Sequence, residues 1–86
     1  MNDLKKFQPY QAFVSQETLW TWNLVSVWNS PKSPSEGAKV IDEIRQPIEV
    51  TVVEEQQETY GLKRKLAKIA YAGKEGWVPS EALTDL

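Results

Sequence analysis

The recurrence of short alternating segments most constrains the fold of this chain. Residues 48–53 alternate apolar and polar side chains and are rich in β-branched residues, which is typical of a half-buried strand. Residues 25–28 alternate in the same way, and residues 40–44 are predicted to form a further short strand. The loop at 29–37 is rich in serine and proline, and glycines bound a hairpin turn at 72–76. The pattern predicts a small all-β barrel or sandwich.

Length and composition fit one small folded domain. The chain has 86 residues, of which 41% are hydrophobic and 26% are charged, and these values are ordinary for a globular protein. No apolar run approaches the roughly 18 residues that a membrane-spanning helix needs. The first residues lack the apolar stretch of a secretory signal. We therefore expect a cytoplasmic protein with no membrane association.

The residue types present leave little for catalysis. The chain has no cysteine and no histidine, so thiolate chemistry, a disulfide framework and the commonest general base and metal ligand are excluded. Two pairs of adjacent carboxylates, at 42–43 and 54–55, fall within predicted strands, where neighbouring side chains point to opposite faces. We expect no enzyme activity, no metal and no cofactor.

The charge is unevenly distributed. The net charge is −2 and the isoelectric point is near 5.1, although residues 61–86 carry five basic against three acidic side chains. A basic segment contains Lys63, Arg64, Lys65 and Lys68. It could contact the phosphates of a nucleic acid, or it could pair across a hairpin with Glu54, Glu55 and Glu58. Because the whole chain is acidic, we favour the cross-strand pairing and do not expect nucleic-acid binding.

Four segments carry a resemblance to the bacterial SH3 domains. They read VWNSP at 27–31, KVI at 39–41, IEVTVV at 48–53 and YAGKEGWVPSEAL at 71–83. The resemblance implies an SH3-like, five-stranded, partly open β-barrel over residues 24–86. Residues 25–28 would be its first strand, and a proline-containing loop would follow. Residues 1–23 would then form an N-terminal arm that packs on the barrel.

The resemblance also implies a function, that of a non-catalytic module that recognises a protein or peptide partner. Leu66 stands where related domains place a shelf tryptophan, and Pro79 matches their shelf proline. Trp28 is expected to point away from the core, Trp77 either packs on the barrel or faces the ligand groove, and Glu36 is an acidic loop residue. The candidate ligand-binding residues are Trp28, Glu36, Leu66, Trp77 and Pro79.

The remaining expectations concern packing. Residues 12–14 are predicted to add a strand at the edge of the sheet, and residues 20–22 to place Trp20 and Trp22 on one face of a strand. We expect both indoles to pack on the barrel or on a second subunit, in a monomer or weak homodimer. We predict positive φ at Gly73 and Gly76. The predicted core comprises Val25, Val27, Val40, Ile44, Val50, Val52, Ile69 and Val78.

Overall fold

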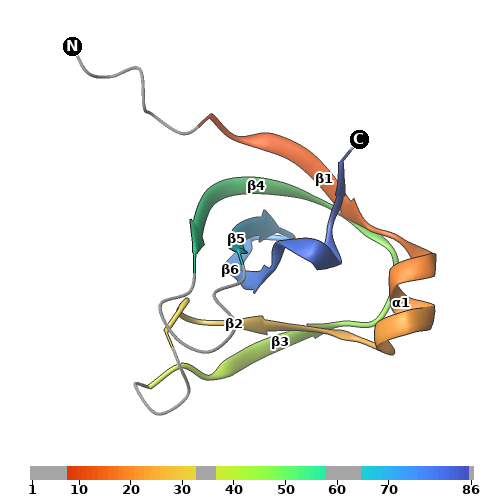
Figure 1. The fold of residues 1–86 in the computed structure, drawn as a ribbon, viewed down its shortest axis with the longest axis horizontal. Helices are drawn as coiled ribbons and strands as arrows, with labels where there is room; N and C mark the ends of the chain where they lie inside the picture. Colours follow the sequence, from red (N-terminus) through yellow and green to blue (C-terminus); the bar gives the residue numbers. More distant parts are fainter. Residues whose placement is uncertain (1–7, 33–36, 58–64, 86) are drawn as a thin grey trace.

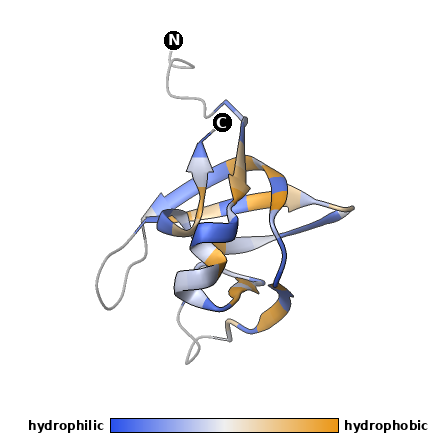
Figure 2. Cartoon of the chain, turned by 90° about the vertical axis from the view of Figure 1, so that its right-hand side faces the viewer, coloured by the Kyte–Doolittle hydropathy of each residue, from blue (hydrophilic) through white to orange (hydrophobic). Residues whose placement is uncertain are grey.

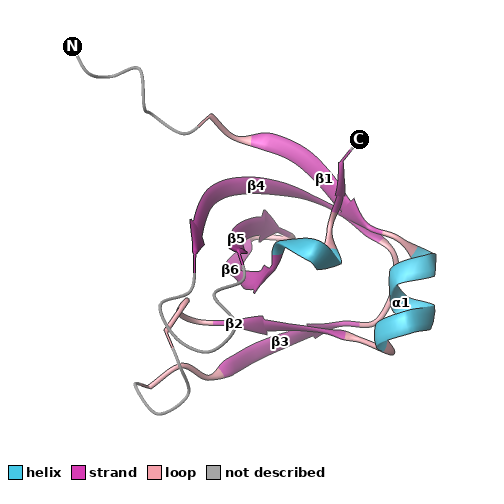
Figure 3. Ribbon diagram, viewed as in Figure 1, coloured by secondary structure: helices cyan, strands magenta, loops and turns pink. Residues whose placement is uncertain are grey.

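The computed structural model describes residues 8–32, 37–57 and 65–85. The chain is mostly antiparallel β-sheet with one short α-helix, which confirms the predicted small all-β fold (Figure 3). In order, the elements are β1 (Tyr10–Val14), α1 (Gln16–Trp22), β2 (Val25–Trp28), β3 (Val40–Ile44), β4 (Ile48–Gln57), β5 (Lys65–Tyr71), β6 (Lys74–Pro79), the 3-10 turn η3 (Ser80–Ala82) and β7 (Thr84–Asp85).

The strands follow the spatial order β3-β2-β6-β5-β4-β1-β7 within the described residues. The long strand β4 curls around the core and pairs with two neighbours, whose ranges overlap at Thr51 and Val52 (Figure 1). Residues 48–52 pair with β1, from Val14↔Ile48 to Tyr10↔Val52, and residues 51–57 pair with β5. The β4–β5 register shifts between Val52 and Glu54, as a β-bulge does where a strand bends. The sheet does not close: β3 and β7 lie at its two ends.

The core lies inside the curled sheet, and Figure 2 shows the hydrophobic stretches on the strands. Alternate residues of the strands supply it, as the period of two requires. All the residues predicted for the core are buried except Val40. The fully buried side chains of largest volume are Val14, Val25, Val27, Val50, Val52, Ile69 and Val78.

The N-terminal part of the chain belongs to this same core. Strand β1 is present as predicted, but it lies between β4 and β7 rather than at the sheet edge. The strand expected at residues 20–22 is wrong, because these residues end helix α1. Ser15 caps that helix by accepting a hydrogen bond at Oγ from the backbone N–H of Thr18, at 3.0 Å.

The helix separates the two tryptophans of α1. Residues two apart on an α-helix point about 200° apart, so Trp20 and Trp22 cannot share a face. Trp22 packs against the core as expected, beside buried Leu19. Trp20 is 75% exposed, so it does not pack on the sheet of its own chain. A contact between Trp20 and a second subunit stays a prediction.

Two glycines of the β5–β6 hairpin have different roles. The turn residues Ala72 and Gly73 have φ of 48° and 77°, as a two-residue type I′ hairpin requires, so the prediction for Gly73 is confirmed. The prediction of positive φ for Gly76 is wrong. Gly76 lies within β6, where an added Cβ would be 2.3 Å from Val27 Cγ1 and 3.0 Å from the carbonyl oxygen of Trp28. Gly76 therefore lets β2 approach β6 closely.

Val40 is 43% exposed, so its assignment to the core is wrong. A register shift in the β2–β3 pairing places Val40 opposite Trp28, while Asp42 lies opposite the core residue Val27. Local alternation predicts that one side of a strand is buried, but it does not reveal that β3 lies at the end of the sheet.

Candidate functional site

Four predicted ligand-binding residues lie on one face of the sheet. Trp28 is opposite Trp77 in the β2–β6 pairing, and Leu66 is opposite Pro79 in the β5–β6 pairing. Lys68 lies opposite Trp77 from the other side. Residues directly opposite one another in an antiparallel pair project to the same face. We name this set the aromatic face: Trp28, Leu66, Lys68, Trp77 and Pro79.

The aromatic face lies on the side of the sheet opposite to the main core. Its neighbours along the strands, Val27, Ala67 and Val78, are fully buried members of that core. Trp77 and Leu66 are only 6% and 9% exposed, yet they lie outside the main core cluster. They form a buried floor, and the half-buried side chains of Trp28 and Pro79 border it.

Backbone contacts fix the two bordering residues. Just after Trp28, Asn29 donates its backbone N–H to the carbonyl oxygen of Lys39 and accepts the Lys39 N–H at Oδ1, both at 2.9 Å. Just after Pro79, the Ser80 hydroxyl donates to the carbonyl oxygen of Lys65 at 3.1 Å. The last strand residues of β2 and β6 are therefore held in place. Asn29 was predicted as the first residue of the loop at 29–37, but not as a residue that fixes this site.

The other predicted site residues divide between described and undescribed parts of the chain. Glu36, Lys63 and Arg64 lie outside the described residues. Lys65 and Lys68 are described, and each has a carboxylate partner. Lys65 Nζ is 3.4 Å from Glu55 Oε1, and Lys68 Nζ is 3.5 Å from Glu75 Oε1.

The Lys65–Glu55 ion pair agrees with the predicted cross-strand pairing of the basic segment, whereas the ion-pair partner of Lys68 is Glu75 of β6 and not one of the predicted glutamates. Glu54 lies directly opposite Lys68 in the β4–β5 pairing, and the Lys65–Glu55 ion pair also joins these two strands. Exposed pairs of this kind contribute at most about 1 kcal/mol each. Their main consequence is electrostatic. The carboxylates near Lys65 and Lys68 neutralise part of the positive charge of these two side chains, and this reduces their attraction for phosphate.

A polar cluster that the sequence analysis did not single out joins β3 to the β5–β6 hairpin. The Tyr71 hydroxyl donates to Asp42 Oδ2 at 2.6 Å, and Lys74 Nζ donates to the same oxygen at 3.2 Å. The hydrogen bond from Tyr71 is the main cause that lowers the pKa of Asp42. Burial, followed by the contact with Asp42, raises the pKa of Tyr71. Tyr71 is thus held neutral, and the cluster fastens β3 to the sheet.

A comparison of the chain with protein-family models, curated proteins and solved structures found no match. The SH3 resemblance therefore rests on the residues of this chain alone. Within residues 8–32, 37–57 and 65–85, no cluster of acidic side chains has the arrangement of a metal site. No helix in the same part of the chain has the length and apolar character needed to cross a bilayer.

Proposed function

We propose that this protein is a non-catalytic, SH3-like binding module that recognises an extended peptide segment of a protein partner. One observation carries the proposal. The four described residues singled out by the SH3 resemblance come from three strands, and they lie together on the aromatic face. Half-buried indole and proline side chains such as Trp28 and Pro79 suit extended, proline-containing or apolar peptides, because their ring faces offer apolar contact at low cost in conformational entropy.

The strand arrangement supports an SH3-like barrel with a different first strand from the one the sequence suggested. Strands β4, β5 and β6 form a meander, the turn η3 follows, and β7 returns to pair with β1. We infer that β1, which lies between β4 and β7, is the first strand of the barrel. Helix α1 and the β2–β3 hairpin then form a long insertion between β1 and β4. This insertion supplies Trp28 to the aromatic face.

A selection from a library of random peptides displayed on phage tests the proposal. Peptides selected on the full chain should be rich in proline and apolar residues. Their affinity should fall about tenfold or more for Trp28→Ala, since a central tryptophan commonly dominates such an interface. The matched control is Trp20→Ala, which removes an exposed indole that lies on helix α1 and is not part of the aromatic face. Trp77 is unsuitable as a test because it is buried.

Two outcomes would contradict the proposal. One is that no peptide is enriched on the folded chain. The other is that Trp28→Ala and Trp20→Ala reduce affinity equally, which would place the contact elsewhere or indicate adsorption to any indole. The melting temperature of each variant, measured in parallel, shows whether a loss of binding reflects a loss of the fold.

The alternative function, contact with nucleic acid through the basic segment, gains no support from its described residues. Lys65 and Lys68 both have carboxylate partners. Binding to single-stranded DNA at low salt that weakens steeply as salt rises would favour this alternative over peptide recognition.

A further inference from the structure

Strands β2 and β3 are joined to the rest of the sheet by little backbone pairing. In the described part of the chain, β3 stands at one end of the strand order and pairs only with β2 (Figure 1). Strand β2 in turn has a single residue pair with β6, Trp28↔Trp77, whereas β5 pairs with β6 at six positions. Because Trp28 belongs to the aromatic face, the contacts that hold β2 and β3 in place also position this indole.

Buried apolar side chains hold the β2–β3 pair against the sheet. Val25, Val27 and Ile44 are members of the core cluster. Apolar burial is non-directional, whereas a hydrogen bond weakens steeply when its geometry is lost. A directional contact therefore adds what apolar packing lacks, which is a preference for one position of the two strands.

Asp42 supplies directional contacts of this kind on β3. Its Oδ2 accepts a hydrogen bond from the Tyr71 hydroxyl at 2.6 Å and another from Lys74 Nζ at 3.2 Å. Tyr71 ends β5 and Lys74 begins β6, and neither strand is next to β3 in the sheet order. The two bonds therefore bypass β2 and tie β3 directly to the β5–β6 hairpin. We name Asp42, Tyr71 and Lys74 the β3 latch.

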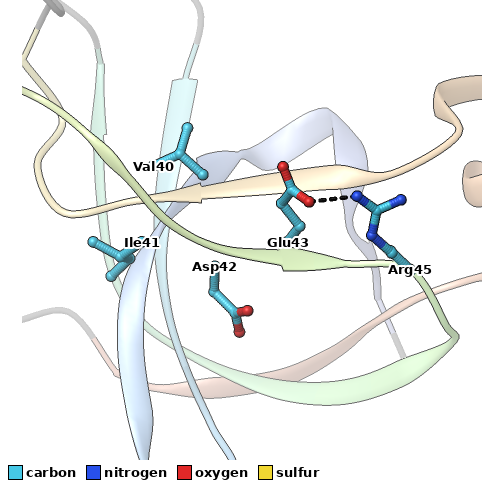
Figure 4. Close-up of a pocket in the computed structure, with 5 residues that line it drawn as sticks. All are labelled: Val40, Ile41, Asp42, Glu43 and Arg45. Atoms are coloured by element: carbon cyan, nitrogen blue, oxygen red, sulfur yellow. Dashed lines mark hydrogen bonds and ion pairs between the residues drawn. The ribbon is translucent and has the colours of Figure 1, made fainter.

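The β3 latch lies on the core side of the sheet, opposite to the aromatic face. Asp42 lies opposite the core residue Val27 in the β2–β3 pairing, and Tyr71 is itself a member of the core cluster. Figure 4 shows the Asp42 carboxylate on the other side of β3 from Val40, which lies opposite Trp28. A substitution in the β3 latch therefore removes no contact surface from the aromatic face.

We propose that the β3 latch positions Trp28 for peptide recognition, through its hold on β3 and the β2–β3 pairing. Trp28 directly follows Val27, the residue that lies opposite Asp42. With the latch intact, Trp28 stays beside Trp77. Without it, the β2–β3 pair shifts relative to β6, and Trp28 moves between more than one position. The role in peptide binding rests on the proposed function, but the hold on Trp28 does not.

NMR relaxation dispersion of the full chain without peptide tests the hold on Trp28. Tyr71→Phe keeps the buried ring and removes only the hydroxyl, and Lys74→Met removes the exposed donor of the latch. Each variant should add microsecond-to-millisecond exchange at the Trp28 indole and at the amides of β2 and β3, and leave β1 and β4 unchanged. The matched control is Tyr10→Phe, which removes a hydroxyl that donates to Glu55 between β1 and β4. This control should leave Trp28 unchanged.

The affinity for a peptide from the phage selection tests the role in binding. Tyr71→Phe should weaken binding about threefold to tenfold in the otherwise unmodified chain, but less than about 1.5-fold in a Trp28→Ala background, because the latch acts through this indole. Tyr10→Phe should leave the affinity unchanged in both backgrounds. Coupling of this kind separates a positioning role from a general loss of stability, which would lower the melting temperature without depending on Trp28.

The proposal would be overturned if neither latch variant added exchange at Trp28, or if Tyr10→Phe added as much. An equal loss of affinity in the Trp28→Ala background would overturn it as well. A peptide whose affinity depends on Trp28 but not on the β3 latch would contradict this proposal and leave the proposed function intact. Added exchange at Trp28 in a chain that enriches no peptide would instead contradict the proposed function, and with it the role of the latch in binding.

Discussion

Gly76→Ala should destabilise the protein more than any ordinary surface change, although it adds one methyl group. The new Cβ would lie 2.3 Å from Val27 Cγ1, 3.0 Å from the carbonyl oxygen of Trp28 and 3.2 Å from Ile41 Cδ1. Val27 is fully buried, so its side chain has no free space to enter, and the second contact is to backbone. To relieve the overlap, β2 must move away from β6, and Trp28 moves with it.

The size of the effect follows from these contacts. Overpacking of a filled core costs about 1–3 kcal/mol, and a contact this short with buried and backbone atoms belongs near the upper end. Loss of glycine's freedom in the unfolded chain offsets about 0.5–1 kcal/mol of this cost. A net loss of about 2 kcal/mol corresponds to a fall of roughly 8–16 °C in the melting temperature of a domain of this size.

Thermal unfolding followed by circular dichroism measures the change. In the control Gly73→Ala, the added Cβ has no atom within 4 Å, so only the strain of φ +77° remains, a cost of about 1–2 kcal/mol. In a Val27→Ala background, Gly76→Ala should cost less, because the closest contact is gone. Equal melting temperatures for Gly76→Ala and the unmodified protein would refute the reasoning, and so would an unchanged cost in the Val27→Ala background.

Three further predictions concern single contacts. Ser15→Ala removes the N-cap of α1 and should lower the free energy of unfolding in urea by about 1 kcal/mol; no change would mean that the cap is not formed. The Tyr10 hydroxyl donates to Glu55 at 2.5 Å, and this bond is the main cause that raises the pKa of Tyr10 from 10.0 to about 12. Its stabilising effect is present below pH 10.0 and is lost as the pH rises toward 12, so an ultraviolet titration should show a tyrosine that ionises near 12, absent in Tyr10→Phe. The hydrogen bond from Tyr71 lowers the pKa of Asp42 below 3.8, so the stability that Asp42 contributes is present above pH 3.8 and is lost as the pH falls through its folded-state pKa. Asp42→Asn should therefore be less stable at neutral pH but converge with the unmodified protein in acid, and a constant difference would contradict this assignment.

Local patterns predicted the strands, but not where each strand lies in the sheet. Alternation identifies which side of β2, β4 and β5 is buried, because burial follows the pleat. The same rule failed at residues 20–22, where two tryptophans with one residue between them resemble a strand. The deciding feature was the cap at Ser15, which favours a helix that buries Leu19. Val40 was misplaced because the position of β3 at the sheet edge depends on pairings distant in sequence.

The aromatic face was predicted only as a set of separate residues. Their meeting depends on the β2–β6 pairing, which opposes Trp28 and Trp77, and on the absence of a side chain at Gly76. A sequence pattern signals that a glycine stands in a strand, but it does not reveal which neighbour approaches it. The cluster of Asp42 with Tyr71 and Lys74 was missed for the same reason, since β3, which carries Asp42, is distant in the chain from the β5–β6 hairpin.

The most direct test of peptide recognition follows the four tryptophan indole N–H resonances while a peptide from the phage selection is added to the full chain. Trp28 belongs to the aromatic face and Trp20 does not, so the two indoles act as a reporter and a control within one protein. The proposed function predicts a saturable shift of the Trp28 indole resonance and an unmoved Trp20 resonance. A saturable shift of Trp20 with Trp28 unmoved, or no shift of either indole at a saturating peptide concentration, would contradict it.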